Sequence, residues 1–169
     1  PFVHDHGGNA SDNEIEESHR LLTLGRMNSG EFWEEVGVDG DPFELNEDYL
    51  RYIKLASGTT DFLKEMRRRD LSVAVVTNDA SDWSQMLRDR HGLAVVEPWI
   101  VSAEVGVRKP DPGIFEHARA ALGTPAARTV FVGDDPVAER NWSGFLPDGI
   151  ERAWREARGD DLGDNLREE

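Results

Sequence analysis

Three acidic residues follow an apolar run in the second half of the chain. The run is Thr129–Val132, and Asp134, Asp135 and Glu139 come after the glycine that ends it. β-Branched and aromatic residues without a polar break indicate a buried parallel strand, which places the acids at its carboxyl end. Two carboxylates about 4 Å apart repel by roughly 4 kcal/mol at an effective dielectric near 20, so such a cluster needs a cation. Mg²⁺ is the hard divalent cation that suits carboxylates and phosphate together.

Asp135 has a second interpretation, because it directly precedes Pro136. Aspartate is a good helix N-cap and proline is favoured at the first helical position. A cap explains Asp135 and leaves Asp134 and Glu139 unexplained. We therefore expect Asp134 and Glu139 to be metal ligands.

Two further polar signals follow apolar or glycine-bounded segments. Thr77-Asn78 comes after Val73–Val76, and Lys109 precedes a proline. The Thr77 hydroxyl and the neighbouring N–H can bind phosphoryl oxygens, and the Lys109 ammonium can neutralise charge on a phosphoryl group. Taken singly, the first is an ordinary turn and the second a solvated loop lysine. Taken together with the acids, they predict a phosphate cradle in which Thr77, Asn78 and Lys109 bind substrate.

The first nine residues predict a short strand that ends in a turn at Gly7-Gly8. His4 and His6 would share one face of that strand and could hold a metal, although a solvated chain end is the ordinary interpretation. Asp5, just before the glycines, is a further candidate carboxylate at a strand end.

Periodicity and turn residues indicate how the chain positions these groups. Strands are expected over 71–76, 99–102 and 129–132, and helices over 11–24, 29–33, 42–56, 57–69, 81–91, 112–122 and 150–158. Alternating strands and helices predict an α/β fold, a Rossmann-like doubly wound parallel sheet. We expect residues 1–9 to start the core, 10–56 to form a helical subdomain, 57–158 to complete the core and 159–169 to be an acidic tail.

Composition narrows the class of partner. The formal net charge is −15 over 169 residues, which argues against nucleic acid or an anionic membrane. A small phosphorylated substrate stays compatible, because a metal and a lysine can invert the local field. The chain has no cysteine and no membrane-length apolar run, so we expect a cytoplasmic protein. Oligomeric state is not indicated.

These segments resemble three motifs of the haloacid dehalogenase (HAD) superfamily of hydrolases. Val75–Asp79 is similar to the second family motif, Ser102–Phe115 is very close to the third, and Val130–Glu139 resembles the fourth. The resemblance covers roughly residues 57–140. It implies a HAD-like core, with residues 10–56 as the cap subdomain that covers the active site and selects substrate.

The family's first motif is a strand followed by Asp-x-Asp, and its nearest counterpart is Val3–Gly8. The resemblance then implies that Asp5 is the nucleophile, with Gly7 in the position of the acid/base. Two other interpretations stay open: the first motif is missing from this chain, or the protein is a degenerate, non-catalytic member.

The resemblance implies a Mg²⁺-dependent phosphatase of a small phosphorylated metabolite, working through an aspartyl-phosphate. Asp5, Thr77 and Lys109 would be catalytic, and Asp5, Asp134 and Glu139 would hold Mg²⁺. Dehalogenases of the family tend to carry serine and asparagine where this chain has Gly133-Asp134, so the acids favour a phosphatase. A 2-haloacid dehalogenase-like hydrolase and an inactive binding or regulatory module remain the alternatives.

Overall fold

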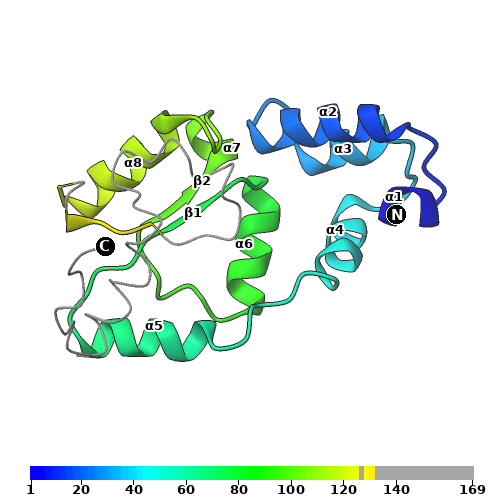
Figure 1. The fold of residues 1–169 in the computed structure, drawn as a ribbon. Helices are drawn as coiled ribbons and strands as arrows, with labels where there is room; N and C mark the ends of the chain where they lie inside the picture. The colour runs from blue at the N-terminus through cyan, green and yellow to red at the C-terminus, as the bar shows by residue number, and fades with distance from the viewer. Residues whose placement is uncertain (126–127, 132–169) are drawn as a thin grey trace, which may run out of the picture.

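In the computed structural model, residues 1–125 and 128–131 are described (Figure 1). The predicted metal ligands Asp134 and Glu139 lie outside these residues, as do the predicted helix 150–158 and the tail 159–169.

Two parallel strands lie at the centre of the α/β part. β1 (Val75–Thr77) pairs with β2 (Trp99–Val101), with Thr77 opposite Val101. The carboxyl ends of both strands therefore reach the same edge, where ligands bind in open α/β sheets. Helices α5 (Thr59–Arg68) and α8 (Pro112–Leu122) lie on opposite sides of the two strands (Figure 1). This is the parallel α/β arrangement that the sequence predicts.

Both strands are shorter than predicted. Residues 71–74 are not in a strand, and neither is the described part of 129–132. Within residues 1–125 and 128–131 the sheet has only these two strands, so residues 71–74 find no neighbouring strand there to pair with. Leu71 is accordingly 49% exposed.

Side-chain caps set where the N-terminal helices begin. Ser11 with Glu14, and Asn28 with Glu31, form capping boxes in which each side chain bonds the other residue's backbone. Asp41 accepts two backbone N–H groups at the start of the next helix. The helices are α2 (Asp12–Thr23), α3 (Ser29–Glu35) and α4 (Pro42–Leu50), and α4 ends six residues earlier than predicted.

Two short helices were not predicted. Residues 2–5, expected as a strand, form helix α1 (Phe2–Asp5), and Ser102–Val105 form helix α7 directly after β2. The strand prediction at the N-terminus is wrong because Val3 is buried against the neighbouring helices, where no strand of the described chain lies beside it. Helix α6 (Ser81–Arg90) agrees with its prediction within one residue.

One apolar core joins the N-terminal helices to α6. Helices α1–α4, here called the helical unit, bury Leu22, Trp33 and Leu50 in a cluster that also contains Ala80 and Trp83. Trp83, on α6, is 2% exposed. The helical unit is therefore built partly on the helix that follows β1. No helix in the described part of the chain is long and apolar enough to cross a membrane.

Inside this cluster, the side chain of Asn46 is the centre of a buried hydrogen-bond network. Its Oδ1 accepts the indole N–H of Trp33 at 2.8 Å and that of Trp83 at 2.6 Å. Its Nδ2 donates to Ser29 Oγ at 2.9 Å and to Asp82 Oδ2 at 3.2 Å, and Ser29 Oγ also donates to Asp82. The network thus connects α3 and α4 to the first turn of α6.

Candidate active site

The loop after β1 and the loop that carries Lys109 are held together by one side chain. Asn78 Nδ2 donates to the backbone carbonyl of Lys109 at 2.9 Å, and Asn78 Oδ1 accepts the backbone N–H of Lys109 at 2.7 Å. Thr77 is the last residue of β1 and Asn78 follows it. The structure therefore brings the predicted Thr77-Asn78 turn and the predicted lysine to the same edge of the sheet.

The Lys109 ammonium also lies near the segment that precedes the acidic motif. Its Nζ is 5.4 Å from the centre of the Phe131 ring, at cation–π distance. Phe131 in turn packs edge-on against Phe115 of α8. Asp134 follows Phe131 by three positions in the sequence but lies outside the described residues, so its place relative to Lys109 stays a prediction.

Ser102 ties the edge of the sheet to the helical unit. Its hydroxyl accepts the backbone N–H of Asp79 at 3.0 Å and donates to the carbonyl of Thr23, in α2, at 2.6 Å. Ser102 is fully buried. This serine was not among the predicted site residues, although its place at the end of the predicted strand 99–102 was a usable signal.

Asp79 is a second residue at this edge that was not among the predicted site residues. Burial raises the pKa of its carboxyl to about 7, with the negative charge of Asp82 acting in the same direction. The N–H of Ala80, which donates to Asp79 Oδ1 at 2.9 Å, opposes that increase in pKa. A carboxyl with a pKa near 7 is partly protonated at neutral pH, whereas an exposed aspartate is ionised.

Two ring side chains of the helical unit pack on α6, the helix that follows β1. The ring centroids of His19 and Tyr49 lie 6.3 and 4.7 Å from that of Trp83. Burial lowers the pKa of His19, with the positive charge of Arg108 acting in the same direction, which favours the neutral imidazole. Burial raises the pKa of Tyr49, with a contribution from the negative charge of Asp79.

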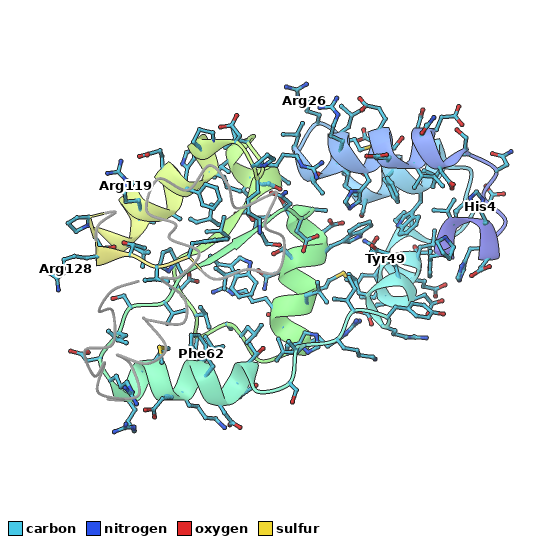
Figure 2. All side chains as sticks on the ribbon, in the orientation of Figure 1. His4, Arg26, Tyr49, Phe62, Arg119 and Arg128 are labelled. Atoms are coloured by element: carbon cyan, nitrogen blue, oxygen red, sulfur yellow. The ribbon has the colours of Figure 1, made fainter. Side chains whose placement is uncertain are left out.

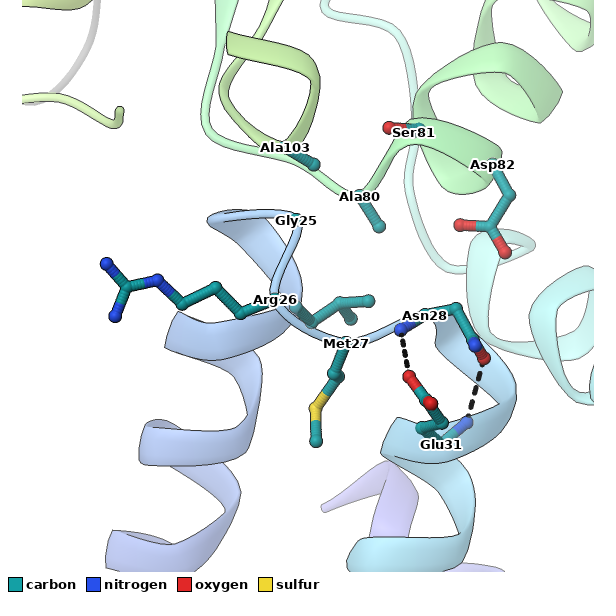
Figure 3. A pocket seen from close by; sticks show the side chains of 10 residues that line it. Gly25, Arg26, Met27, Asn28, Glu31, Ala80, Ser81, Asp82 and Ala103 are labelled. Atoms are coloured by element: carbon teal, nitrogen blue, oxygen red, sulfur yellow. Dashed lines mark hydrogen bonds between the residues drawn. The ribbon is translucent and has the colours of Figure 1, made fainter. Parts of the chain in front are cut away.

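A pocket of about 480 Å³ opens between the two parts of the molecule (Figure 3). The connection between α2 and α3 lines one side with Arg26 and Asn28, and Glu31 of α3 lies beside them. Residues after β1 and β2, among them Asp82, line the other side. The Glu31 carboxylate accepts the Asn28 backbone N–H at 2.7 Å. Arg26 is exposed, and its side chain extends away from Asn28, Glu31 and Asp82 (Figure 3).

Gly25 allows the helical unit to approach the α/β part closely at this pocket. A Cβ added at Gly25 would lie 2.1 Å from the carbonyl oxygen of Ala103, and the residue has a φ of +68°. Both the contact and the left-handed backbone require glycine here.

Asp5 does not reach this site. It lies on α1, which Figure 1 shows at the opposite end of the molecule from β1 and α8, and its neighbour His4 is far from Arg119 of α8 (Figure 2). The expected strand-end position of Asp5 is therefore wrong, because residues 2–5 are helical and pack on the helical unit. Ring nitrogens of His4 and His6 bond the carbonyls of Gly8 and Phe2. Over residues 1–125 and 128–131, no group of three or more acidic or histidine side chains could hold a metal ion.

Comparison with known proteins decides the family. The model of the family described as haloacid dehalogenase-like hydrolase matches residues 13–137. This chain is a HAD-like hydrolase. The match includes the α2–α4 helices, both strands and the loops that carry Thr77, Asn78 and Lys109, and it reaches Asp134 of the acidic motif.

Curated relatives of this HAD-like hydrolase are phosphatases. It is 35% identical over 94 residues to a phosphoserine phosphatase of Thermus thermophilus, which covers 55% of this chain and 37% of that protein. It is 27% identical over 151 residues to a pyrimidine 5'-nucleotidase of Escherichia coli, which covers 85% of this chain and 65% of that protein. The chain thus spans between about a third and two thirds of the length of these relatives.

Solved structures share the fold. A HAD family enzyme of Bacteroides thetaiotaomicron, crystallised as an aspartate-to-alanine mutant with magnesium and inorganic phosphate, superposes with a TM-score of 0.61 at 15% identity. The superposition covers 95% of this chain and 93% of that one. It confirms the HAD-like α/β fold of this hydrolase.

Proposed function

We propose that this HAD-like hydrolase is a phosphatase that acts on a small phosphorylated metabolite. The observation that carries the proposal is the paired hydrogen bond between Asn78 and Lys109, which sets a lysine beside the Thr77 turn. A hydroxyl and an ammonium at the carboxyl edge of a parallel sheet are groups that bind phosphoryl oxygens. The phosphatase names of the relatives and the phosphate in the Bacteroides enzyme support the same substrate class.

The proposed roles follow from the chemistry of each group. The Thr77 hydroxyl and the backbone N–H of Asn78 bind phosphoryl oxygens, and Lys109 neutralises the charge that builds up on the phosphoryl group in the transition state. The family resemblance makes the attacking carboxylate an aspartate, and because Asp5 lies on α1 at the far end of the molecule, we assign this role to none of the described residues. Attack on phosphorus breaks the bond to the ester oxygen and releases the alcohol, leaving an aspartyl-phosphate that water hydrolyses to inorganic phosphate and the free carboxylate.

Mg²⁺ would be held by Asp134 and Glu139, with the carboxylate that attacks as a third ligand. The described residues do not themselves provide a metal site. We therefore assign no geometry to the metal. When bound, it would stabilise negative charge on the phosphoryl oxygens.

The test is turnover of a generic phosphate ester, p-nitrophenyl phosphate, by the full chain with Mg²⁺. We expect Lys109→Met to lower kcat by roughly 100-fold or more, because it removes a charge that acts on the transition state. Lys64→Met is the matched control, since Lys64 is exposed and pairs with the exposed Asp61 at 3.4 Å; we expect it to leave turnover unchanged.

Two results would count against the proposal. Turnover that persists after prolonged EDTA treatment would contradict the dependence on Mg²⁺. Halide release from a 2-haloacid, without turnover of phosphate esters, would instead identify a dehalogenase-like hydrolase.

A further inference from the structure

We propose that Asn78 is a positioning residue, whose side-chain amide fixes Lys109 relative to Thr77 and does not itself contact the substrate. The inference rests on the proposed phosphatase function and refines the substrate-binding role predicted for Asn78. That role then belongs to the backbone N–H of Asn78, while the side chain acts through Lys109.

The contact uses both ends of the carboxamide. A carboxamide offers one carbonyl oxygen and two N–H donors, and here the oxygen and one donor engage the N–H and C=O of the same residue, Lys109. Two bonds to the backbone of one residue fix its direction as well as its distance. They join positions 31 residues apart in the chain, so no local turn could replace them.

Lys109 needs such an anchor because its own side chain is flexible. The lysine side chain has four methylene groups, so its ammonium ranges over several ångströms even about a fixed backbone, and a mobile backbone would widen that range. The turn that follows is closed by the Asp111 N–H donating to the Arg108 carbonyl at 2.8 Å. The ammonium lies 5.4 Å from the centre of the Phe131 ring. Anchoring the Lys109 peptide at Asn78 therefore defines where the charge can reach.

Other residue types cannot make this pair of bonds. Aspartate has the same shape and keeps an acceptor for the Lys109 N–H, but it places a second carboxylate oxygen against the Lys109 carbonyl, where a donor is required. Alanine removes both bonds. Asn78→Asp thus loses one hydrogen bond and adds a repulsion, whereas Asn78→Ala loses both hydrogen bonds without a repulsion.

The first experiment is a double-mutant cycle of Asn78→Ala and Lys109→Ala in the full chain, with kcat and KM measured on p-nitrophenyl phosphate. We expect Asn78→Ala alone to lower kcat/KM roughly 10- to 100-fold, as a misplacement of about 1 Å does. In the Lys109→Ala background, the same change should cost less than about twofold, because the residue on which it acts is gone. Multiplicative losses would overturn the proposal, since a direct substrate contact or a general loss of folding predicts them.

The second experiment does not depend on turnover. The chain has three lysines, Lys54, Lys64 and Lys109, whose acylation rates can be compared by peptide mass spectrometry. We expect Asn78→Ala and Asn78→Asp to change the labelling rate of Lys109 at least threefold and to leave the other two lysines unchanged. An unchanged rate at Lys109 would overturn the positioning role. If the wild-type chain showed no phosphate-ester turnover, only the proposed function would fail, and the labelling result would still decide the role of Asn78.

Discussion

Replacing Asn46 by alanine should destabilise the protein more than any single surface change. The substitution removes the acceptor of two buried indole N–H groups, on Trp33 and Trp83, which are each 2% exposed. It also removes the Nδ2 donor to Ser29 and Asp82. The two indole groups and the Ser29 hydroxyl stay behind in buried positions, whereas Asp82 is exposed and can bond to water instead.

The magnitude can be worked from the network. A buried donor that loses its acceptor costs about 1–3 kcal/mol, so the two indole groups alone predict about 2–6 kcal/mol. The free energy of unfolding of a native protein is about 5–15 kcal/mol, so the loss is a large share of the total. At about 2–4 °C per kcal/mol, the melting temperature should fall by roughly 10 °C.

Urea unfolding followed by tryptophan fluorescence measures this directly, because Trp33 and Trp83 are the indoles concerned. Asn13→Ala is the matched control, since Asn13 is exposed on α2 and should change the free energy of unfolding by less than about 0.5 kcal/mol. A loss below about 1 kcal/mol for Asn46→Ala would refute the reasoning. It would mean that the two indole N–H groups find other acceptors.

Three further outcomes follow from the geometry. Gly25→Ala should lower the free energy of unfolding by about 2–4 kcal/mol, because its Cβ would meet the carbonyl of Ala103. Gly92→Ala, with a similar φ of +64° and open space around it, should lower it by only about 1 kcal/mol. Equal losses for the two variants in urea unfolding would contradict the clash. Ser102→Ala should lower the free energy of unfolding by about 1–3 kcal/mol, because the Asp79 N–H and a buried carbonyl of α2 lose their hydrogen-bond partner. Slower hydrogen exchange at the Asp79 amide in this variant would argue against that reasoning. The pKa of Asp79 is raised by burial to about 7, so the folded state holds that proton more tightly than the unfolded state. The stabilisation that comes from this protonation is complete at low pH and is lost as pH rises from about 4 through 7. Over that interval the free energy of unfolding of the wild type should fall by about 1–3 kcal/mol relative to that of Asp79→Asn. Parallel curves of stability against pH for the two proteins would contradict this.

Local signals predicted the elements that carry their own start and stop residues. Helix α8 agrees with its prediction at both ends, because Asp111 caps it, Pro112 begins it and Gly123 ends it in the left-handed conformation. The start of helix α2 was predictable in the same way, because Ser11 caps it. The misses are α1 and α7, each four residues long and too short to show a helical period.

The sequence predicted that the Thr77-Asn78 turn and Lys109 lie close together, but not the contact that joins them. The residue types at Thr77 and Lys109 suggested a phosphate cradle because each follows a strand end or a proline-bounded loop. The carboxamide bridge of Asn78 could not be read from the sequence, since its partner is 31 residues away. The same holds for Asn46 of α4, whose central place depends on four side chains from two other helices, α3 and α6.

Helix α6 is fastened to the helical unit at both of its ends. Asp82 and Trp83 join the Asn46 network at the first turn, and Arg90 pairs with Glu47 of α4 at 2.9 Å near the last. The same helix leaves directly from the turn that contains Thr77 and Asn78. Any tilt of the N-terminal helices would therefore be transmitted through α6 to the turn that contains Thr77 and Asn78, so the helical unit and this edge of the sheet are mechanically coupled.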